Sequence, residues 1–157
     1  MTERTPEIEE NAKDNAVVEA LRQVVADSYA LLGQTHLCHW NVRGPSFFSL
    51  HNAFEEQYTE LFPAIDELAE RIRALGALAP GGLQNLAAMA GMEEISESAS
   101  SEEMVAHLLR ANQKLVGDLM RARDLAGESG DVETEDLMIA RAQVHQKNIW
   151  MLKSFLA

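Results

Sequence analysis

The stretch LHNAFEEQYTELFPAIDELAERI, residues 50–72, decides the fold class because its apolar side chains recur at helical spacing. They follow one another at intervals of three and four residues, as on the buried face of an amphipathic helix: Leu50, Phe54, Tyr58, Leu61, Ile65, Leu68 and Ile72. We predict a helix from about Ser46 to Leu75, preceded by a break at Gly44-Pro45 and ended by Gly76. Pro63 removes one backbone hydrogen bond inside this helix and favours a kink there.

The same kind of pattern predicts three more long helices and a short one. The first spans about 11–42, a short apolar helix covers about 83–90, and Ser100 with Glu103 forms a capping box that opens the third. A turn over 127–130 then leads into a fourth helix, about 132–155. Their expected core stripes are Val17, Leu21, Val24, Val25, Ser28 and Leu32; Met104, Leu108, Leu115, Val116 and Leu119; and Leu137, Val144, Met151, Leu152 and Phe155, with Trp150 and the methionines also assigned to the core.

Four long amphipathic helices joined by one long middle connection predict an all-α protein. The arrangement is that of a ferritin-like four-helix bundle, with the short helix lying in the crossover connection between the second and third long helices. The 157 residues suffice for a single domain with one core, and we detect no internal repeat. Residues 1–10 are expected to form a flexible acidic tail in front of this domain.

Composition narrows the possible functions. A net charge of −12 and a pI of about 4.7 argue against a general binder of nucleic acid or anionic membranes, which would present a basic patch. No apolar run approaches the roughly 18 residues of a membrane helix, and the acidic N-terminus lacks the apolar segment of a signal peptide. The single cysteine, Cys38, is expected to be a small buried residue in a reducing compartment. A cytoplasmic location is therefore expected.

Five side chains of the metal-ligand type lie at the end of the first helix and along the second: His39, His51, Glu55, Asp66 and Glu70. His51 and Glu55 are four residues apart and share a helix face, as do Asp66 and Glu70. Taken alone, such a pair is most often part of a solvated helix surface. The spacing between the two pairs is more informative.

Fifteen residues separate His51 from Asp66, and the same number separates Glu55 from Glu70. On a straight helix this corresponds to about 22 Å of rise and about 60° of rotation, so the pairs share similar faces but cannot bind one ion within one chain. Two copies of the helix, packed antiparallel across a two-fold axis, would place each imidazole-bearing pair opposite the partner's carboxylate pair. Two identical sites would result.

The donor set favours a particular metal chemistry. Imidazole with carboxylates, in the absence of a thiolate set, suits iron or a similar divalent metal. A dinuclear site inside one bundle would need Glu-x-x-His motifs, and the chain contains none. The sequence therefore favours an iron site shared between subunits.

Three segments resemble the signature of the Dps mini-ferritins: HWNVRGP at residues 39–45, FFSLH at 47–51 and IDELAERI at 65–72. The likeness extends to the chain length, the short helix in the middle connection and the acidic start of the last helix. It implies a shell of twelve subunits with tetrahedral symmetry that oxidises Fe(II), with hydrogen peroxide and also with oxygen, stores the ferric product and limits oxidative damage. DNA compaction is the alternative function within that family.

The resemblance also implies roles for individual residues. His39 and His51 would supply imidazole ligands, and the partner's Asp66 and the partner's Glu70 would supply carboxylates. Glu55 takes the position of a further ligand that is Asp in several members, and its longer side chain could alter the geometry. Trp40 matches a tryptophan that can intercept oxidising radicals; an apolar wedge between helices is an equally good interpretation.

The acidic start of the last helix has two interpretations. Acids at a helix N-terminus are stabilised by the helix dipole, which explains the whole cluster without any function. Resemblance to the family instead assigns Asp131 and Asp136 to a negatively charged pore through which Fe(II) enters the shell. His36 is interpreted as a surface or core histidine in preference to an auxiliary ligand, and no role is assigned to His107 or His145.

Two other classes of function compete with an iron-oxidising enzyme. A DNA-compacting protein would need cations to contact phosphate, yet residues 1–15 carry five acids against Arg4 and Lys13, and no basic tail follows at Ala157. Direct DNA binding is therefore not expected. A helical bundle that only binds other proteins would have no use for five metal-type ligands at matching positions.

Overall fold

The computed structural model describes residues 12–157, and for residues 12–15 it describes the backbone alone. The acidic tail expected over residues 1–10 lies outside this part of the chain. The elements are α1 (Ala12–Asn41), α2 (Phe47–Ala74), α3 (Leu83–Met89), α4 (Ser101–Ser129) and α5 (Val132–Leu156). The chain is all-α over the described residues, as predicted.

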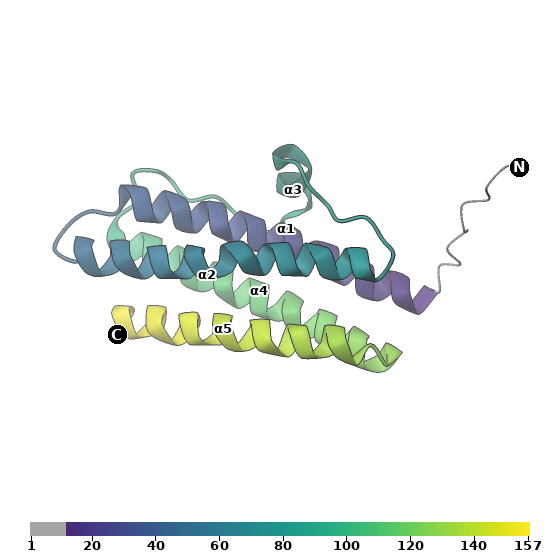
Figure 1. Ribbon diagram of the computed structural model, residues 1–157. Helices are drawn as coiled ribbons and strands as arrows, with labels where there is room; N and C mark the ends of the chain where they lie inside the picture. Colours follow the sequence, from purple (N-terminus) through teal and green to yellow (C-terminus); the bar gives the residue numbers. More distant parts are fainter. Residues whose placement is uncertain (1–11) are drawn as a thin grey trace, which may run out of the picture.

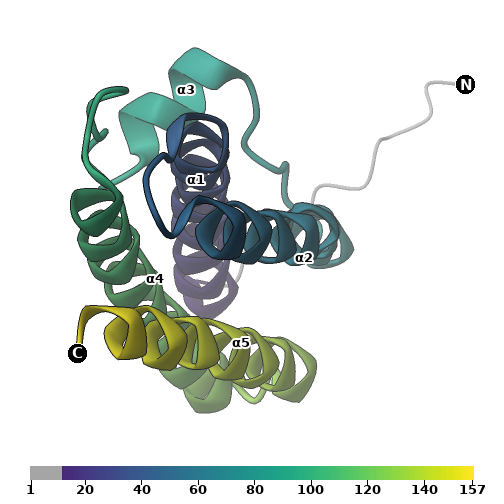
Figure 2. The same cartoon turned by 90° about the vertical axis from the view of Figure 1, so that its left-hand side faces the viewer.

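The four long helices form an antiparallel bundle, with α1 and α2 in one layer and α4 and α5 in the other (Figure 1). Helix α1 packs against both α2 and α4, and α4 packs against α5. The long connection from α2 to α4 carries α3, which lies outside the bundle against α1, as the end-on view of Figure 2 shows. The predicted four-helix bundle with a helix in the crossover connection is confirmed.

The core is built from the stripes that the helical period predicts for the first three long helices. On α2, six of the seven predicted side chains are buried and Tyr58 is half-buried. Every predicted position of α1 and α4 is buried as well. Each helix therefore buries one face, which supplies most of the driving force for packing.

Helix α5 does not follow its predicted stripe. Leu152 is buried and Leu137 and Val144 are half-buried, but Met151 and Phe155 are 40% and 37% exposed. Trp150, also assigned to the core, is 64% exposed. The buried face instead carries Thr134, Met138, Arg141, Ala142, His145 and Leu152. A search for apolar periodicity fails here because polar side chains that are hydrogen-bonded occupy part of the core.

The ends of α4 are set by local chemistry. Ser100 accepts a hydrogen bond from the backbone N–H of Glu103 at 3.1 Å, and the Glu103 carboxylate accepts one from the Ser100 N–H at 2.7 Å. The predicted capping box is thus confirmed. The turn predicted over 127–130 is too long, because α4 continues to Ser129 and ends at Gly130 with φ 78°. Glycine adopts this left-handed conformation without the clash that a Cβ would cause.

Helix α2 runs without interruption through Pro63. The flanking Leu61, Ala64 and Ile65 are buried, so tertiary packing supports the helix across the missing hydrogen bond. Among the described residues, no helix combines the length and the apolar character needed to cross a membrane.

Candidate metal centre

The last turn of α1 and the first turns of α2 bring His39 and His51 into direct contact. Their rings stack with centroids 3.7 Å apart and an interplanar angle of 18°. His39 is buried and His51 is half-buried. The two chain segments approach because the short loop after α1 reverses the chain and starts α2 alongside it.

Each imidazole is held by the backbone of the other histidine. The Nδ1–H of His39 donates to the carbonyl oxygen of His51 at 2.8 Å, and the Nδ1–H of His51 donates to the carbonyl oxygen of His39 at 2.7 Å. A carbonyl oxygen only accepts, so Nδ1 carries the proton in both rings. With Nδ1 engaged in this way, Nε2 is the atom of each ring that can bind a metal ion, and a neutral imidazole in this tautomer has its lone pair there.

Aromatic side chains surround this imidazole pair. Tyr58 meets His39 and His36 edge-on, at centroid distances of 5.1 Å and 4.3 Å. Trp40 stacks on His36 at 5.1 Å and is 68% exposed. Trp40 is therefore not an apolar wedge between helices of this chain. Burial lowers the pKa of His36, with a smaller contribution from His39, so its ring is neutral at pH 7.

Tyr58 and His36 are the neighbours that sequence reasoning did not connect to the imidazole pair. Tyr58 was assigned to the core stripe of α2, and the structure places it at the boundary between core and site. A usable signal existed, because His36 and Trp40 are four residues apart on one helix and must share a face.

Glu55 lies one helical turn after His51 and is exposed. It lines an open acidic hollow on α2 together with Asn52, Glu56, Thr59 and Glu60. The side chain is thus free of the protein core and available to a cation beside the imidazole pair.

The carboxylate pair lies toward the other end of α2. Asp66 and Glu70 are both exposed, and within residues 16–157 neither side chain forms a hydrogen bond or an ion pair. Asp66 opens into a cavity of about 720 Å³, here called the Asp66 cavity, between α1, α2 and residues 80–86. Its walls are mostly apolar and include Val25, Tyr29, Phe62, Leu83 and Leu86.

The structure therefore separates the predicted ligands into two groups. It brings His39, His51 and the region of Glu55 together and leaves Asp66 and Glu70 apart from them. Over the residues that are described, no cluster of three or more His, Cys, Asp or Glu side chains could hold a metal ion. A single chain therefore presents the predicted ligands as two separate groups.

The two predicted pore residues differ in their surroundings. Asp131 caps α5: its carboxylate accepts from the N–H of Thr134 at 3.1 Å and from the Thr134 hydroxyl at 2.6 Å. It also pairs with Arg71 of α2 at 2.8 Å. Burial raises the pKa of Asp131, but the Thr134 hydrogen bonds and the Arg71 charge outweigh it and leave the pKa below its usual value. Asp136 is exposed.

A polar network that the sequence did not reveal crosses the core between α2, α4 and α5. Arg141 binds the Glu60 carboxylate through both terminal nitrogens and donates to His145 Nε2 at 3.1 Å. The Nδ1–H of His145 donates to the side-chain oxygen of Asn112 at 2.9 Å. Burial, with a contribution from Arg141, lowers the pKa of His145 to about 3, so this ring is neutral and has both nitrogens occupied. It is not a candidate ligand.

Cys38 lies beside the imidazole pair in the sequence but takes no part in it. Its side chain is fully buried, as expected, and burial raises the pKa of the thiol to about 12. The thiol stays protonated at neutral pH and is a poor nucleophile and a poor ligand.

Comparison with known proteins places this geometry in a family. The model of the ferritin-like domain matches residues 18–157. The chain is 40% identical over 136 residues to a DNA protection during starvation protein of Brevibacillus brevis, covering 87% of this chain and 91% of the relative. A second such protein, from Bacillus anthracis, is 35% identical over 140 residues, covering 89% and 96%.

Solved structures agree with the sequence relatives. The crystal structure of a Dps protein from Bacillus brevis superimposes with a TM-score of 0.91 at 37% identity, covering 94% of this chain and 99% of the other. A Dps protein from Vibrio cholerae, described as a member of a broad superfamily of ferritin-like diiron-carboxylate proteins, gives a TM-score of 0.91 at 30% identity, covering 98% and 100%.

Proposed function

This chain belongs to the Dps family of ferritin-like proteins, and on that basis we propose that it is a ferroxidase whose iron sites are shared between two subunits. Fe(II) is the substrate, hydrogen peroxide and oxygen are the oxidants, and ferric iron is stored in a hollow shell. Twelve subunits, a cytoplasmic location and a role against oxidative damage form part of this proposal. Direct DNA binding does not.

One observation carries the proposal: the two halves of a suitable donor set are both present and cannot meet within one chain. A backbone carbonyl engages Nδ1 of His39 and of His51, which leaves Nε2 of each ring as the ligating atom. Asp66 and Glu70 present carboxylates that no other described side chain engages. Nitrogen and carboxylate oxygen together suit Fe(II). The ferric product then leaves the site for storage.

The surface around Asp66 supports a partner subunit at this place. Phe62 and Leu83 flank the Asp66 cavity and are 67% and 76% exposed in the isolated chain. Large apolar side chains in such a cluster mark a protein interface. A two-fold contact over this face, with the two copies of α2 antiparallel, would set the partner's carboxylates against the imidazole pair of this chain.

The residues would divide the work of oxidation among them. His39 and His51 bind and orient the incoming cation, the partner's Asp66 and the partner's Glu70 neutralise its charge, and Glu55 completes the donor set. Two Fe(II) ions at one site would supply the two electrons that, with two protons from solvent, reduce one hydrogen peroxide to two waters and leave two Fe(III) ions. Paired electron donation avoids release of a hydroxyl radical. Trp40, beside the site and exposed, would intercept a radical that escapes.

A subunit-mixing experiment tests the shared site. One variant carries His51→Ala with Glu55→Ala, and a second carries Asp66→Ala with Glu70→Ala. Each alone should assemble, because Glu55, Asp66 and Glu70 are exposed and His51 is only half-buried, and each should lack rapid Fe(II) oxidation. After both are dissociated, mixed and reassembled, a mixed pair contains one doubly damaged site and one intact site. Fast oxidation should therefore return in proportion to the number of mixed pairs.

Native mass spectrometry verifies that mixed particles have formed and reports the number of subunits. Wild-type protein is dissociated and reassembled in parallel, and this control measures the activity lost in the procedure. Mixed particles that stay as slow as both parents would contradict a site between subunits.

A further inference from the structure

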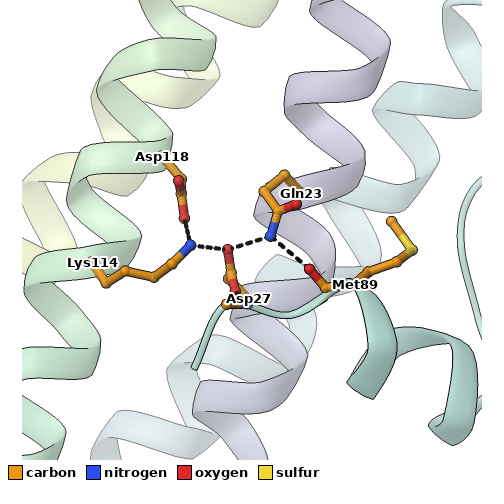
Figure 3. Close-up of polar contacts among 6 residues, drawn as sticks. Gln23, Asp27, Met89, Lys114 and Asp118 are labelled. Carbon is orange, nitrogen blue, oxygen red and sulfur yellow. Dashed lines mark hydrogen bonds and ion pairs between the residues drawn. The ribbon is translucent and has the colours of Figure 1, made fainter. Parts of the chain in front are cut away.

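A buried charge on α1 fastens the crossover connection to the bundle. Asp27 is 0% exposed, a rare environment for a carboxylate. Gly91, two residues beyond α3, donates its backbone N–H to Asp27 Oδ1 at 2.8 Å. The amide of Gln23 donates to the Asp27 carboxylate at 2.8 Å and to the carbonyl oxygen of Met89 at 3.0 Å (Figure 3).

Lys114 completes this arrangement from α4. Its ammonium donates to Asp27 Oδ2 at 2.7 Å and to Asp118 Oδ2 at 2.6 Å, so it bridges the two carboxylates (Figure 3). Asp27, Gly91, Lys114 and Asp118 are called the Asp27 clamp below. The clamp joins α1, α4 and the segment that follows α3.

The end of the Lys114 side chain passes close to the backbone at Gly91. A Cβ at Gly91 would lie 2.7 Å from Lys114 Cε and 3.0 Å from Lys114 Nζ. A methyl group would displace the lysine or push the connection outward. The close approach thus couples the position of the connection to the ion pair.

The charged forms of Asp27 and Lys114 are favoured, whereas burial and the neighbouring Asp27 raise the pKa of Asp118. Burial raises the pKa of Asp27, but a hydrogen bond from Asp118, when that carboxyl group is protonated, and hydrogen bonds from Gln23, Lys114 and Gly91 outweigh it and leave the pKa below its usual value. Burial lowers the pKa of Lys114, and its two carboxylate partners more than compensate, raising the pKa. A buried ion pair is costly to desolvate, so its main contribution is to select one geometry.

The Asp27 clamp holds the segment that follows α3, and α3 lies beside the carboxylate half of the proposed iron site. Helix α3 ends two residues before Gly91, and its Leu83 and Leu86 form one wall of the Asp66 cavity. Leu86 is buried against the bundle, whereas Leu83 points outward and is 76% exposed. A shift of the connection would therefore move the wall that a partner subunit meets beside Asp66.

We propose that the Asp27 clamp is a positioning device for the shared iron site, which fixes α3 so that Leu83 forms part of the two-fold contact beside Asp66. This inference rests on the proposed function. It assigns a task to four residues that bind no iron and that join α1 to α4 and to the segment after α3. Their effect on oxidation is indirect and passes through association of the subunits.

The test is a double-substitution cycle on the full chain. Gly91→Ala breaks the clamp without changing a charge, and Leu83→Ala removes the wall side chain directly. Each should weaken association of the subunit pair roughly tenfold, measured as particle mass against dilution. The double variant should be barely weaker than either single variant, because a displaced α3 no longer presents Leu83.

Gly117→Ala is the matched control. It makes the same chemical change on α4, where nothing lies within 4 Å of the added methyl group. Association and oxidation should stay at the wild-type values. Asp27→Asn supplies a second way to break the clamp if Gly91→Ala does not fold, since it preserves the shape and removes the charge that holds Lys114.

Two further measurements separate positioning from general stability. Amide hydrogen exchange in Gly91→Ala should quicken in residues 83–91 and not in α2. In oxidation assays, the half-saturating Fe(II) concentration should rise roughly tenfold while the rate at saturation of assembled pairs changes little. Faster exchange in α3 with unchanged association, or single effects that multiply in the double variant, would overturn the inference.

Failure of the proposed function would look different. Wild-type protein that assembles but oxidises no Fe(II) with either oxidant would refute the ferroxidase, whereas the association and exchange measurements would still decide the role of the clamp.

Discussion

The two halves of the candidate iron site both involve α2, with His39 of α1 joining the first half, and they are organised in opposite ways. At the start of α2, His51 is stacked on His39, and each ring is tied to the backbone of the other. Farther along the helix, Asp66 and Glu70 are exposed, and Asp66 lines an open cavity. The imidazole half is ordered by its own chain, and under the proposed function the carboxylate half is completed by a partner subunit. Affinity for the first metal ion should therefore depend on the imidazole half, and completion of the site on assembly.

The largest expected effects come from removing one ligand in each half. His39→Ala and Asp66→Ala should both slow Fe(II) oxidation by on the order of a hundredfold or more, since even residues that merely support ligands often cost 10- to 100-fold. Their effects on folding should differ. His39→Ala loses a buried ring stack and leaves the His51 carbonyl without its donor, which should lower the free energy of unfolding by about 2–4 kcal/mol.

Asp66→Ala removes no described contact and should leave the free energy of unfolding nearly unchanged. Denaturant unfolding at one fixed subunit concentration measures the difference, because assembly contributes to apparent stability. Equal losses of stability in both variants would show that the carboxylate half is also built into the fold.

A smaller effect is expected at Glu55, which extends the imidazole half. Glu55→Gln removes the charge without changing the size of the side chain, and should slow oxidation roughly tenfold if the carboxylate is a ligand. Glu56→Gln makes the same change at the next residue, which is turned about 100° around the helix. Stopped-flow oxidation of the two variants gives the comparison. Equal rates would place Glu55 in the general acidic surface.

The smallest effects concern the end of α2 that follows the carboxylate half. Arg71 comes directly after Glu70 and is held by Asp131, so Asp131→Ala should lower the free energy of unfolding by about 1 kcal/mol at neutral pH. The lowered pKa of Asp131 means that its contribution is present above the unfolded value of about 3.9 and disappears as pH falls through the folded value. The gap between wild type and variant should close in that acidic range.

Asp136→Ala is the control for this cap, because Asp136 belongs to the same acidic cluster but is exposed. The pore role of Asp131 and Asp136 remains a prediction and has a separate readout. Asp131→Asn with Asp136→Asn should slow iron uptake a few-fold at low ionic strength if their charges concentrate cations at a pore. An unchanged rate would leave only the helix-capping role.

The core of the bundle illustrates which features a sequence predicts well and which it does not. Periodic apolar side chains predicted α1, α2 and α4, because each of these helices buries a continuous stripe. The same reasoning was wrong for Trp150 on α5, because Arg141 and His145 occupy core positions there. Polar residues enter a core only with partners from other helices, and no local pattern identifies those partners.

The sequence by itself determined the helical period, the chain breaks and the capping box at Ser100, because all of these depend on neighbours within a few residues. The choice of nitrogen and carboxylate donors stays a prediction. The fifteen-residue spacing also predicted that the two pairs of candidate ligands lie too far apart to bind one ion within one chain. Only the tertiary structure decided that His39 and His51 fix each other's tautomer, that Asp131 is held by Arg71 and that Asp27 fastens the connection through Gly91. Each of these contacts joins residues from different helices or loops, and their geometry follows from packing, which a one-dimensional pattern does not contain.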